Sequence, residues 1–416
     1  MQRRKPPESS ISIFEPRRLR CVVPRLASMD KQSIKKEEPG EPKTSNKLAW
    51  IITGHEMFES MVEHIREART SIRLEMYIFE DSIPGRAVME ELILAAERGV
   101  DVRVLLDAWG SASLPTSFWD HLTRLGGRFR WFNPISLRSL GLRNHRKLLV
   151  VDEKFSIIGG FNIANEYIGD GVLHGWRDLG LRIDGPLSED LSESFDSLFA
   201  VGDVALLPFS RLRKSELRKK IQRGNDSLLL SAPGRGRGEF ERALTLDFHA
   251  ASEISIVAAY FLPPPRVRWA LHRAVARGAR VRIILPGKSD VPVSQLASRS
   301  YYQALMRAGI ELFEYQPQIL HAKLVVADDV VYVGSANLDR RSFRINFELT
   351  VRCQDSKLAA QARHIFQDIG SHSSPIDPVA WPKSRGFFDK LKESWSHLLL
   401  ARIDPLVARR QLRTLR

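Results

Sequence analysis

The chain has 416 residues, of which 43% are hydrophobic, and a formal net charge of +14 at pH 7. This length fits two domains of ordinary size or two fused halves of one domain. With only two cysteines, the sequence argues against a disulfide framework and a thiolate zinc site, and it favours a reducing compartment. The positive charge favours polyanionic partners, either nucleic acid or an anionic membrane surface.

The N-terminal part, residues 1–46, is rich in Lys, Arg, Glu, Ser and Pro and has no sustained periodicity. We expect a disordered basic segment there. No apolar h-region follows the basic residues Arg3, Arg4 and Lys5, so the segment does not resemble a secretory signal. No stretch of the chain approaches the roughly 20 apolar residues of a membrane-spanning helix. If the protein works on lipid, we expect it to sit on the membrane surface.

Globular patterning begins at residue 47. Apolar residues recur at helical spacing over 58–65, and the run SIRLEMYIF at 71–79 predicts a strand. A second helical stretch, 88–98, leads into a buried strand at 102–106. This alternation predicts an α/β fold built from βαβ units around a mixed, mostly parallel sheet.

The same plan then appears a second time. Three pairs of strings match in the same order, each pair about 180 residues apart. The pairs are IRLEMYIF (72–79) with ISIVAAYF (254–261), AAERGVDVRVLL (95–106) with AVARGARVRIIL (274–285), and HRKLLVVD (145–152) with HAKLVVAD (321–328). The chain therefore contains an internal duplication, and we expect two similar lobes.

The duplication and the composition together predict five segments. They are a disordered basic segment at 1–46, a first lobe at 47–205, a charged linker at 206–228, a second lobe at 229–370 and a basic amphipathic tail at 371–416. In the tail, six apolar residues fall on one helical face: Phe387, Phe388, Leu391, Trp395, Leu398 and Leu399. Such a helix either lies in a membrane interface or packs its apolar face onto the protein.

Two copies of one motif carry the candidate chemistry. The first contains His145, Lys147, Asp152, Gly159, Gly160 and Asn162, and the second contains His321, Lys323, Asp328, Gly334, Ser335 and Asn337. A single H-x-K-x4-D string arises by chance, and a single histidine is more often a hydrogen-bonded core residue. Two copies, each at the start of an apolar strand and each followed by a Gly-(Gly/Ser)-x-Asn turn, point to a function.

Phosphodiester exchange explains why two histidines are needed. Displacement at phosphorus is roughly in line, so one imidazole attacks while a protonated one donates to the oxygen that leaves on the opposite side. Lysines and asparagines of the same motifs can hold the non-bridging oxygens. No metal and no other cofactor is required. Asp152 and Asp328 belong to the motif, but we expect them to hold strand ends rather than react.

These motifs resemble those of the phospholipase D superfamily, and within it the two-motif bacterial cardiolipin synthases without transmembrane helices. The resemblance covers nearly all of residues 47–370. Supporting strings are YIFEDSIPGR (77–86), WRDLGLRIDGP (176–186), ILPGKSDVP (284–292) and SANLDRRSFRINFE (335–348). The resemblance implies two phospholipase D-like lobes with the active site at their interface.

The resemblance also implies a role for each candidate residue. His145 matches the histidine that forms a phosphohistidine, and His321 matches the histidine that acts first as acid and later as base. The motifs alone leave open which of the two is the nucleophile. The expected catalytic set is His145, Lys147, Asp152, His321, Lys323 and Asp328, with substrate-binding Asn162, Ser335 and Asn337 and histidine-orienting Asp178 and Glu348. One departure is Gly160, where many members have Ser, so a hydroxyl donor is missing from the first motif.

The activity that the resemblance implies is transfer of a phosphatidyl group between phospholipids, with phosphatidylglycerol as donor or acceptor. We therefore expect phospholipid substrates, an anionic membrane as partner and a peripheral place on the cytoplasmic face of the bacterial inner membrane. The alternatives are a hydrolytic phospholipase D, a nuclease of the same superfamily, or a degenerate member that only binds membranes. The extended strings and the tail argue against nucleic acid as a partner. The oligomeric state stays open.

Overall fold

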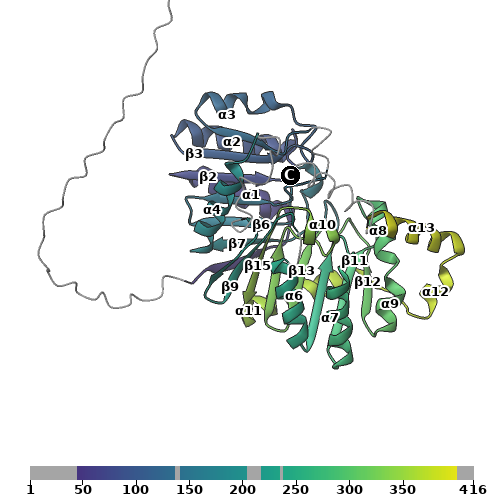
Figure 1. Cartoon of the computed structure of the whole chain (residues 1–416). Helices are drawn as coiled ribbons and strands as arrows, with labels where there is room; N and C mark the ends of the chain where they lie inside the picture. The colour runs from purple at the N-terminus through teal and green to yellow at the C-terminus, as the bar shows by residue number, and fades with distance from the viewer. Residues whose placement is uncertain (1–44, 136–140, 204–216, 235–237, 401–416) are drawn as a thin grey trace, which may run out of the picture. The chain divides into compact units, whose positions relative to one another are not determined.

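The computed structural model describes residues 45–135, 141–203, 217–234 and 238–400 (Figure 1). Nearly all of the predicted segment 1–46 lies outside this range. The two lobes belong to one compact unit, Lys43–Arg416. Among the described residues, no helix is both long enough and apolar enough to cross a bilayer.

The first lobe is a seven-stranded sheet with helices on both faces. Its strands are β1 (Lys47–Ile51), β2 (Ser71–Met76), β3 (Asp101–Asp107), β4 (Arg128–Phe132), β5 (Leu148–Val151), β6 (Phe155–Gly159) and β7 (Gly180–Asp184). Its helices are α1 (Gly54–Glu67), α2 (Ile83–Glu97), α3 (Asp120–Arg124) and α4 (Leu187–Phe199), with 3-10 turns η1 (Thr116–Trp119) and η2 (Asn165–Tyr167). The side chains of Thr53 and Ser82 cap the N-termini of α1 and α2.

The second lobe repeats this plan around a nine-stranded sheet. Its strands are β8 (Lys220–Arg223), β9 (Asp226–Ser231), β10 (Glu253–Ala258), β11 (Arg280–Pro286), β12 (Glu311–Tyr315), β13 (Lys323–Ala327), β14 (Val330–Gly334), β15 (Glu348–Gln354) and β16 (Ser373–Pro375). Its helices are α6 (Glu239–Ala250), α7 (Pro265–Ala276), α8 (Pro292–Arg299), α9 (Tyr302–Arg307), α10 (Arg340–Arg344) and α11 (Ser356–Ser371). Figure 1 shows α6 and α7 side by side in green.

The strand order confirms the duplication and the α/β class. It is β1-β7-β6-β5-β2-β3-β4 in the first sheet and β16-β12-β11-β10-β13-β14-β15-β9-β8 in the second. The central blocks β7-β6-β5-β2-β3-β4 and β12-β11-β10-β13-β14-β15 therefore correspond in reverse order. Both sheets are mixed, as predicted.

The expectation that parallel pairs dominate is wrong. In the first sheet only β2–β3 and β3–β4 are parallel, and in the second only β10–β11 and β11–β12. The other described pairs are antiparallel. A short turn follows the strand of each motif: one joins β5 to β6, and another joins β13 to β14. Strands joined by so short a turn can pair only in the antiparallel direction.

The range 206–228, predicted as a charged linker, is described only from residue 217. There it contains β8 and the start of β9, and β9 pairs with β15 along Asp226–Ser231. This part of the chain therefore belongs to the second sheet. Similarly, the start of the predicted tail contains β16, which pairs with β12.

The two lobes share a hydrophobic core. One cluster of buried residues combines first-lobe side chains such as Leu148 and Leu181 with second-lobe side chains such as Leu324 and Leu349, together with residues of α4 and α11. A second cluster lies under α6 and α7, and a third under α1 and α2. The contact between lobes is thus an extension of the core, which fixes the two motif strands relative to each other.

The tail forms two helices, α12 (Ala380–Ser384) and α13 (Phe387–Leu398), and α13 contacts α8. The predicted helix is present, but its orientation is unusual. The buried residues of α13 are Glu393 and Ser396, while Phe387, Phe388 and Trp395 are 75%, 74% and 61% exposed. Of the two alternatives for this apolar face, packing onto the protein is therefore excluded for the described residues.

Candidate active site

The first histidine is fixed by the backbone of the other lobe. His145 lies three residues before β5, and its N–H donates to the carbonyl of Phe347 at 3.0 Å. Its ring is buried, and Nδ1 lies 3.1 Å from Oε2 of Glu348 in β15. A carboxylate on Nδ1 fixes the ring and leaves Nε2 as the reactive nitrogen.

The second histidine repeats this arrangement with the lobes exchanged. The N–H of His321 donates to the carbonyl of Arg177 at 2.7 Å, and Nδ1 lies 2.6 Å from Oδ2 of Asp178. Isolated bridges pair the residues just before each histidine and each acid, Asn144 with Phe347 and Arg177 with Leu320. Each histidine therefore takes its carboxylate from the other lobe, so neither half-site is complete without the other lobe.

The two carboxylates are held unequally. Glu348 accepts hydrogen bonds from Ser335 Oγ at 2.5 Å, Ser342 Oγ at 2.7 Å and Asn346 Nδ2 at 3.2 Å. Asp178 accepts from the N–H of Leu179 at 2.8 Å. At the position matching Ser335, a Cβ on Gly160 would lie 2.1 Å from Oδ1 of Asp178. The missing hydroxyl of the first motif thus reflects a shorter acid that fills the space of a side chain.

The two motif lysines are buried beside their histidines. Lys147 Nζ donates to the carbonyl of His145 at 2.6 Å and lies over the ring of Tyr77, 5.0 Å from its centroid. Lys323 Nζ lies 2.8 Å from Nδ1 and 3.2 Å from Nε2 of His321. Each motif therefore places an ammonium group next to its imidazole, where an anionic phosphate would be stabilised.

Burial and charge set the protonation of these groups. Burial, together with the nearby lysines Lys147 and Lys323, lowers the pKa of His145 to about 4, although Glu348 opposes the shift. Burial and the charge of Lys323 also lower the pKa of Lys147, to about 7. The pKa values of His321 and Lys323 are lowered, mainly by burial. The charges of both motifs act on one another, as expected for a single site, and the imidazole of His145 is neutral at pH 7.

The predicted substrate-binding amides lie in the same region but differ in their partners. Asn162 Oδ1 accepts the N–H of Ile78 at 3.1 Å, and its Nδ2 donates to the hydroxyl of Tyr167 at 2.7 Å. The backbone N–H of Asn337 donates to Ser342 Oγ at 3.1 Å, whereas its buried side-chain Oδ1 has no hydrogen-bond partner among the described residues. Ser335 is fully buried on Glu348. Within the described residues, Ser335 therefore supports an acid, and a direct contact of these residues with substrate stays a prediction.

The motif aspartates are not at the reacting centre. Asp152 and Asp328 follow the far ends of β5 and β13, seven residues from His145 and His321, roughly 23 Å along an extended strand. Asp152 accepts the N–H groups of Arg69, Thr70 and Ser71, and Asp328 those of Ser252 and Glu253. Their place among the expected catalytic residues is thus corrected, in agreement with the expected strand-end role.

Asp at this motif position also suits the backbone. Asp152 and Asp328 have φ of 51° and 48°, in the left-handed region that Asn and Asp tolerate. We therefore expect Asp152→Asn and Asp328→Asn to lower the free energy of unfolding by about 1 kcal/mol each, because each loses part of its acceptor set but keeps the turn. Urea denaturation with activity assays measures this. A folded variant that loses turnover a hundredfold would instead assign the aspartate to the chemistry.

Several residues of the site were missed by the sequence reasoning. A buried ion pair joins Arg146 Nη2 to Glu75 Oε2 at 3.0 Å, and Asn144 Nδ2 donates to Glu75 Oε1 at 2.6 Å, directly beside His145. Glu75 was visible as the one acid inside an apolar strand run. Aromatic rings also surround the histidines: Tyr77 near His145, and Tyr167, Trp176 and Tyr260 near His321. All four lie in or near the sequence strings that match between the two lobes or resemble the family.

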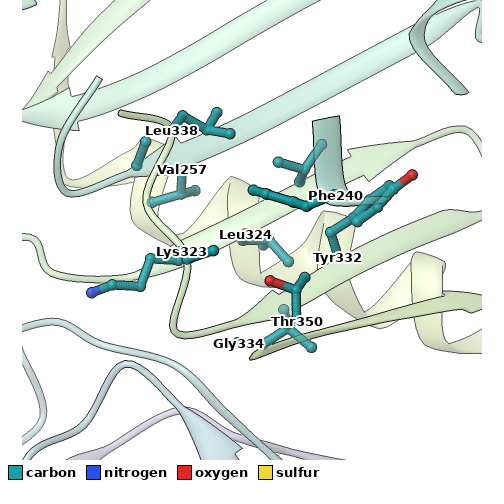
Figure 2. Close-up of a pocket in the computed structure, with 12 residues that line it drawn as sticks. Phe240, Val257, Lys323, Leu324, Tyr332, Gly334, Leu338 and Thr350 are labelled. Carbon is teal, nitrogen blue, oxygen red and sulfur yellow. The ribbon is translucent and has the colours of Figure 1, made fainter. Parts of the chain in front are cut away.

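A small pocket behind Lys323 is distinct from this site. Figure 2 shows Lys323 extending its ammonium group away from Phe240, Tyr332 and Thr350, which line the interior of the second lobe. The pocket is therefore part of the packing under the sheet, and the amine is directed away from it.

Comparison with known proteins agrees with this geometry. Residues 61–199 and 248–369 match the family model described as "Cardiolipin synthase, PLD-like domain". A probable cardiolipin synthase of Bacillus subtilis (strain 168) is 31% identical over 85% of this chain and 72% of its own length. Cardiolipin synthase A of Pseudomonas syringae pv. syringae (strain B728a) is 36% identical over 77% of this chain and 68% of its own length.

Solved structures show the same fold. Phosphatidylserine synthase of Haemophilus influenzae Rd KW20 superposes with a TM-score of 0.67 at 17% identity, covering 87% of this chain and 94% of that one. Polyphosphate kinase of Porphyromonas gingivalis gives a TM-score of 0.55 at 15% identity, covering 81% of this chain and 49% of that one. With the family model matched in both lobes, the resemblance noted from the motifs is confirmed, and the chain belongs to the cardiolipin synthase family with phospholipase D-like domains.

Proposed function

We propose that this protein is a phosphatidyltransferase that makes cardiolipin through a phosphohistidine. The observation that carries the proposal is the exchange of acids between lobes: Glu348 orients His145, and Asp178 orients His321. Two oriented imidazoles in one buried, lysine-lined site suit in-line displacement at a phosphodiester. The family and its cardiolipin synthase relatives supply the substrate class, phospholipid.

In the first step, Nε2 of His145 attacks the phosphorus of a phosphatidylglycerol. The phosphorus–oxygen bond to the glycerol head group breaks, and His321 gives its proton to the departing oxygen. In the second step, the hydroxyl of another phosphatidylglycerol gives its proton to His321 and attacks the same phosphorus. The phosphorus–nitrogen bond breaks, which releases cardiolipin and restores neutral His145. Lys147 and Lys323 stabilise the negative oxygens in both steps.

Hydrolysis is the competing outcome, because water can attack the same intermediate. The burial of both histidines, 7% and 4% exposed, supports transfer over hydrolysis by limiting water at the phosphorus. The test is to incubate the protein with phosphatidylglycerol vesicles and measure products by lipid mass spectrometry. We expect cardiolipin and glycerol; phosphatidic acid as the main product would replace this proposal with a hydrolytic phospholipase D.

The pKa values predict a bell-shaped pH dependence of kcat/KM. As pH falls through about 4, His145 takes up a proton and loses its nucleophilic lone pair, so kcat/KM falls. As pH rises through the lowered pKa of His321, the imidazole loses the proton that the departing oxygen needs, so kcat/KM also falls. A further fall is expected as pH rises through about 7, where Lys147 loses its charge. Lys147→Arg keeps a positive charge at all these pH values, so it should remove this further fall and leave the first one in place. An unchanged profile in this variant would contradict the assignment to Lys147.

We further propose that α13 is the membrane-binding element. Its outward face carries six apolar side chains, each at least 38% exposed: Phe387, Phe388, Leu391, Trp395, Leu398 and Leu399. Its inner face is polar: Arg385 forms an ion pair with Glu393, and His397 Nε2 lies 2.8 Å from the hydroxyl of Tyr301. A helix with apolar residues outward is stabilised by a lipid surface, and the nearby Lys390 and Lys392 suit anionic lipid.

This placement predicts a large loss of membrane binding on substitution. Burying one such side chain contributes roughly 1.5–3 kcal/mol, so Phe387→Ser, Phe388→Ser and Trp395→Ser together should weaken binding to anionic vesicles about a hundredfold or more. Vesicle sedimentation measures this. The control is Ile83→Ser with Leu246→Ser, which removes two exposed apolar residues elsewhere. Equal binding by the triple variant and the control would exclude α13 as the anchor.

The remaining proposal concerns location. A peripheral protein that consumes phosphatidylglycerol and binds anionic lipid through α13 suits the cytoplasmic face of a bacterial inner membrane. Fractionation with a salt and carbonate wash, together with protease access in spheroplasts, tests this placement. We expect release by the wash and protection from external protease.

A further inference from the structure

The two histidines have different surroundings. His145 has Tyr77 and Lys147 beside it, and Arg143 stacks on Trp109 nearby, 4.6 Å from the ring centroid. The His321 side has three aromatic rings, with centroids 5.6 Å (Tyr167), 5.6 Å (Trp176) and 6.3 Å (Tyr260) from that of the imidazole. It also has an exposed acid, Asp290. Both sides thus have a lysine and an orienting acid, but only the His321 side adds three aromatic rings and a second, exposed carboxylate, Asp290, among the described residues.

Asp290 is hydrogen-bonded to a tyrosine whose ring contacts His321. It lies in the segment between β11 and α8, and its Oδ2 accepts the hydroxyl of Tyr260 at 2.5 Å. Tyr260 follows β10 and packs edge-on against the His321 ring. The negative charge of Asp290 acts on both His321 and Lys323, where it opposes the lowering of their pKa values by burial. The carboxylate is therefore part of the surroundings of the reacting groups.

A carboxylate at this place does not help to bind a phosphodiester, since like charges repel. It does suit the part of the substrate that donates hydrogen bonds, the alcohol that leaves or attacks. A cationic head group fits less well, because the ammonium of Lys323 lies in the same neighbourhood and would repel it. Hydroxyl groups on a polyol meet no such repulsion, and they bind well to a carboxylate flanked by aromatic rings.

We propose that Asp290, positioned by Tyr260, binds a second hydroxyl of the polyol head group while the reacting hydroxyl faces His321. This subsite deepens the proposed function and rests on it. The bound alcohol would approach phosphorus from the His321 side, so His321 gives and takes the proton of the alcohol. His145 would then attack from the opposite side. The subsite thus favours glycerol-bearing acceptors over simple alcohols and water.

Competition between alcohols tests the subsite directly. The protein is incubated with phosphatidylglycerol vesicles and either deuterated glycerol or propan-1-ol, which lacks a further hydroxyl. Labelled phosphatidylglycerol, phosphatidylpropanol and phosphatidic acid are measured by mass spectrometry. In Asp290→Asn we expect the ratio of glycerol exchange to propan-1-ol transfer to fall about tenfold or more, as for loss of a hydrogen bond to a charged group. The ratio of propan-1-ol transfer to hydrolysis should stay within about twofold, because formation of the intermediate is common to all three products and cancels in both ratios.

Two further variants sharpen the result. Tyr260→Phe should reproduce the selective loss of glycerol exchange more weakly, since the carboxylate stays but loses its anchor. Asp329→Asn, an equally conservative change at an exposed acid in the β13–β14 turn, should leave all three products unchanged. Equal loss of glycerol and propan-1-ol transfer in Asp290→Asn, or no loss of either, would overturn the subsite.

The outcomes also separate this inference from the proposed function. If the wild-type protein exchanges glycerol but forms no cardiolipin, the proposed function fails while the glycerol-to-propanol ratio still decides the subsite. If the wild-type protein transfers to water alone, both proposals are overturned.

Discussion

Replacing either motif histidine should abolish turnover. We expect His145→Ala and His321→Ala each to lower kcat for cardiolipin formation by at least about 10⁴-fold, because one removes the nucleophile and the other the proton donor. Since the two act as a unit, the double variant should be no worse than the more severe single variant. Product formation in phosphatidylglycerol vesicles, followed by lipid mass spectrometry, measures all three.

The control for this prediction is His249→Ala, at an exposed position in the last turn of α6. It should retain wild-type turnover. If one of the two site variants kept more than about a hundredth of wild-type activity, that histidine would not carry an essential step, and the division of roles between lobes would be wrong.

Replacing an orienting acid should lower kcat almost as much as replacing a histidine. We expect Glu348→Gln and Asp178→Asn each to lower kcat about 10³-fold or more, because an amide can present N–H to Nδ1 and so favour the wrong tautomer. The two variants should differ in how they depend on the leaving group. Glu348→Gln slows attack by His145 with any leaving group, whereas Asp178→Asn slows proton transfer by His321, which a nitrophenolate leaving group does not need. Rapid-quench measurement of the burst of nitrophenol from a phosphatidyl nitrophenol, beside the burst of glycerol from phosphatidylglycerol, separates the two effects.

A matched control exists for the buried acids. Glu314 is also buried and charge-paired, with Arg299, but lies in β12 away from both histidines. Glu314→Gln should therefore leave the burst unchanged in the folded protein. If Glu348→Gln and Asp178→Asn slowed the nitrophenol burst to the same extent, the assignment of one acid to each histidine would be contradicted.

Much of this site could be predicted from the sequence because its histidines and lysines recur at the same short spacing in both lobes. The repeated H-x-K-x4-D strings identified both histidines and lysines, and their position before apolar strands predicted that they would lie at strand ends. The resemblance also implied that Asp178 and Glu348 orient histidines. Which acid serves which histidine could not be predicted. That pairing depends on the backbone bridges between lobes, such as Asn144 with Phe347, and these join residues about 200 apart.

The errors have equally local causes. Apolar strand runs do not reveal strand direction, so the antiparallel pairs around β5–β6 and β13–β14 were not anticipated. The polar segment 217–228 was taken as linker because β8 is an exposed strand next to a turn, where charged residues are common. The period of residues 387–399 predicted a helix and its apolar face. The burial of Glu393 and Ser396, with the ion pair of Arg385 and Glu393, shows that the polar face is turned inward.

The central claim is that His145 and His321 act on one phosphorus atom from opposite sides. The most direct measurement is rapid trapping of the covalent intermediate from labelled phosphatidylglycerol at alkaline pH, where a phosphorus–nitrogen bond is stable, with peptide mapping, in the wild-type protein and both histidine variants. The account predicts label on His145 in the wild-type protein and none in His145→Ala. In His321→Ala, which lacks the acid of the first step and the base of the second, label on His145 should form more slowly and then persist. Label on His321, or label on each histidine independent of the other, would contradict it.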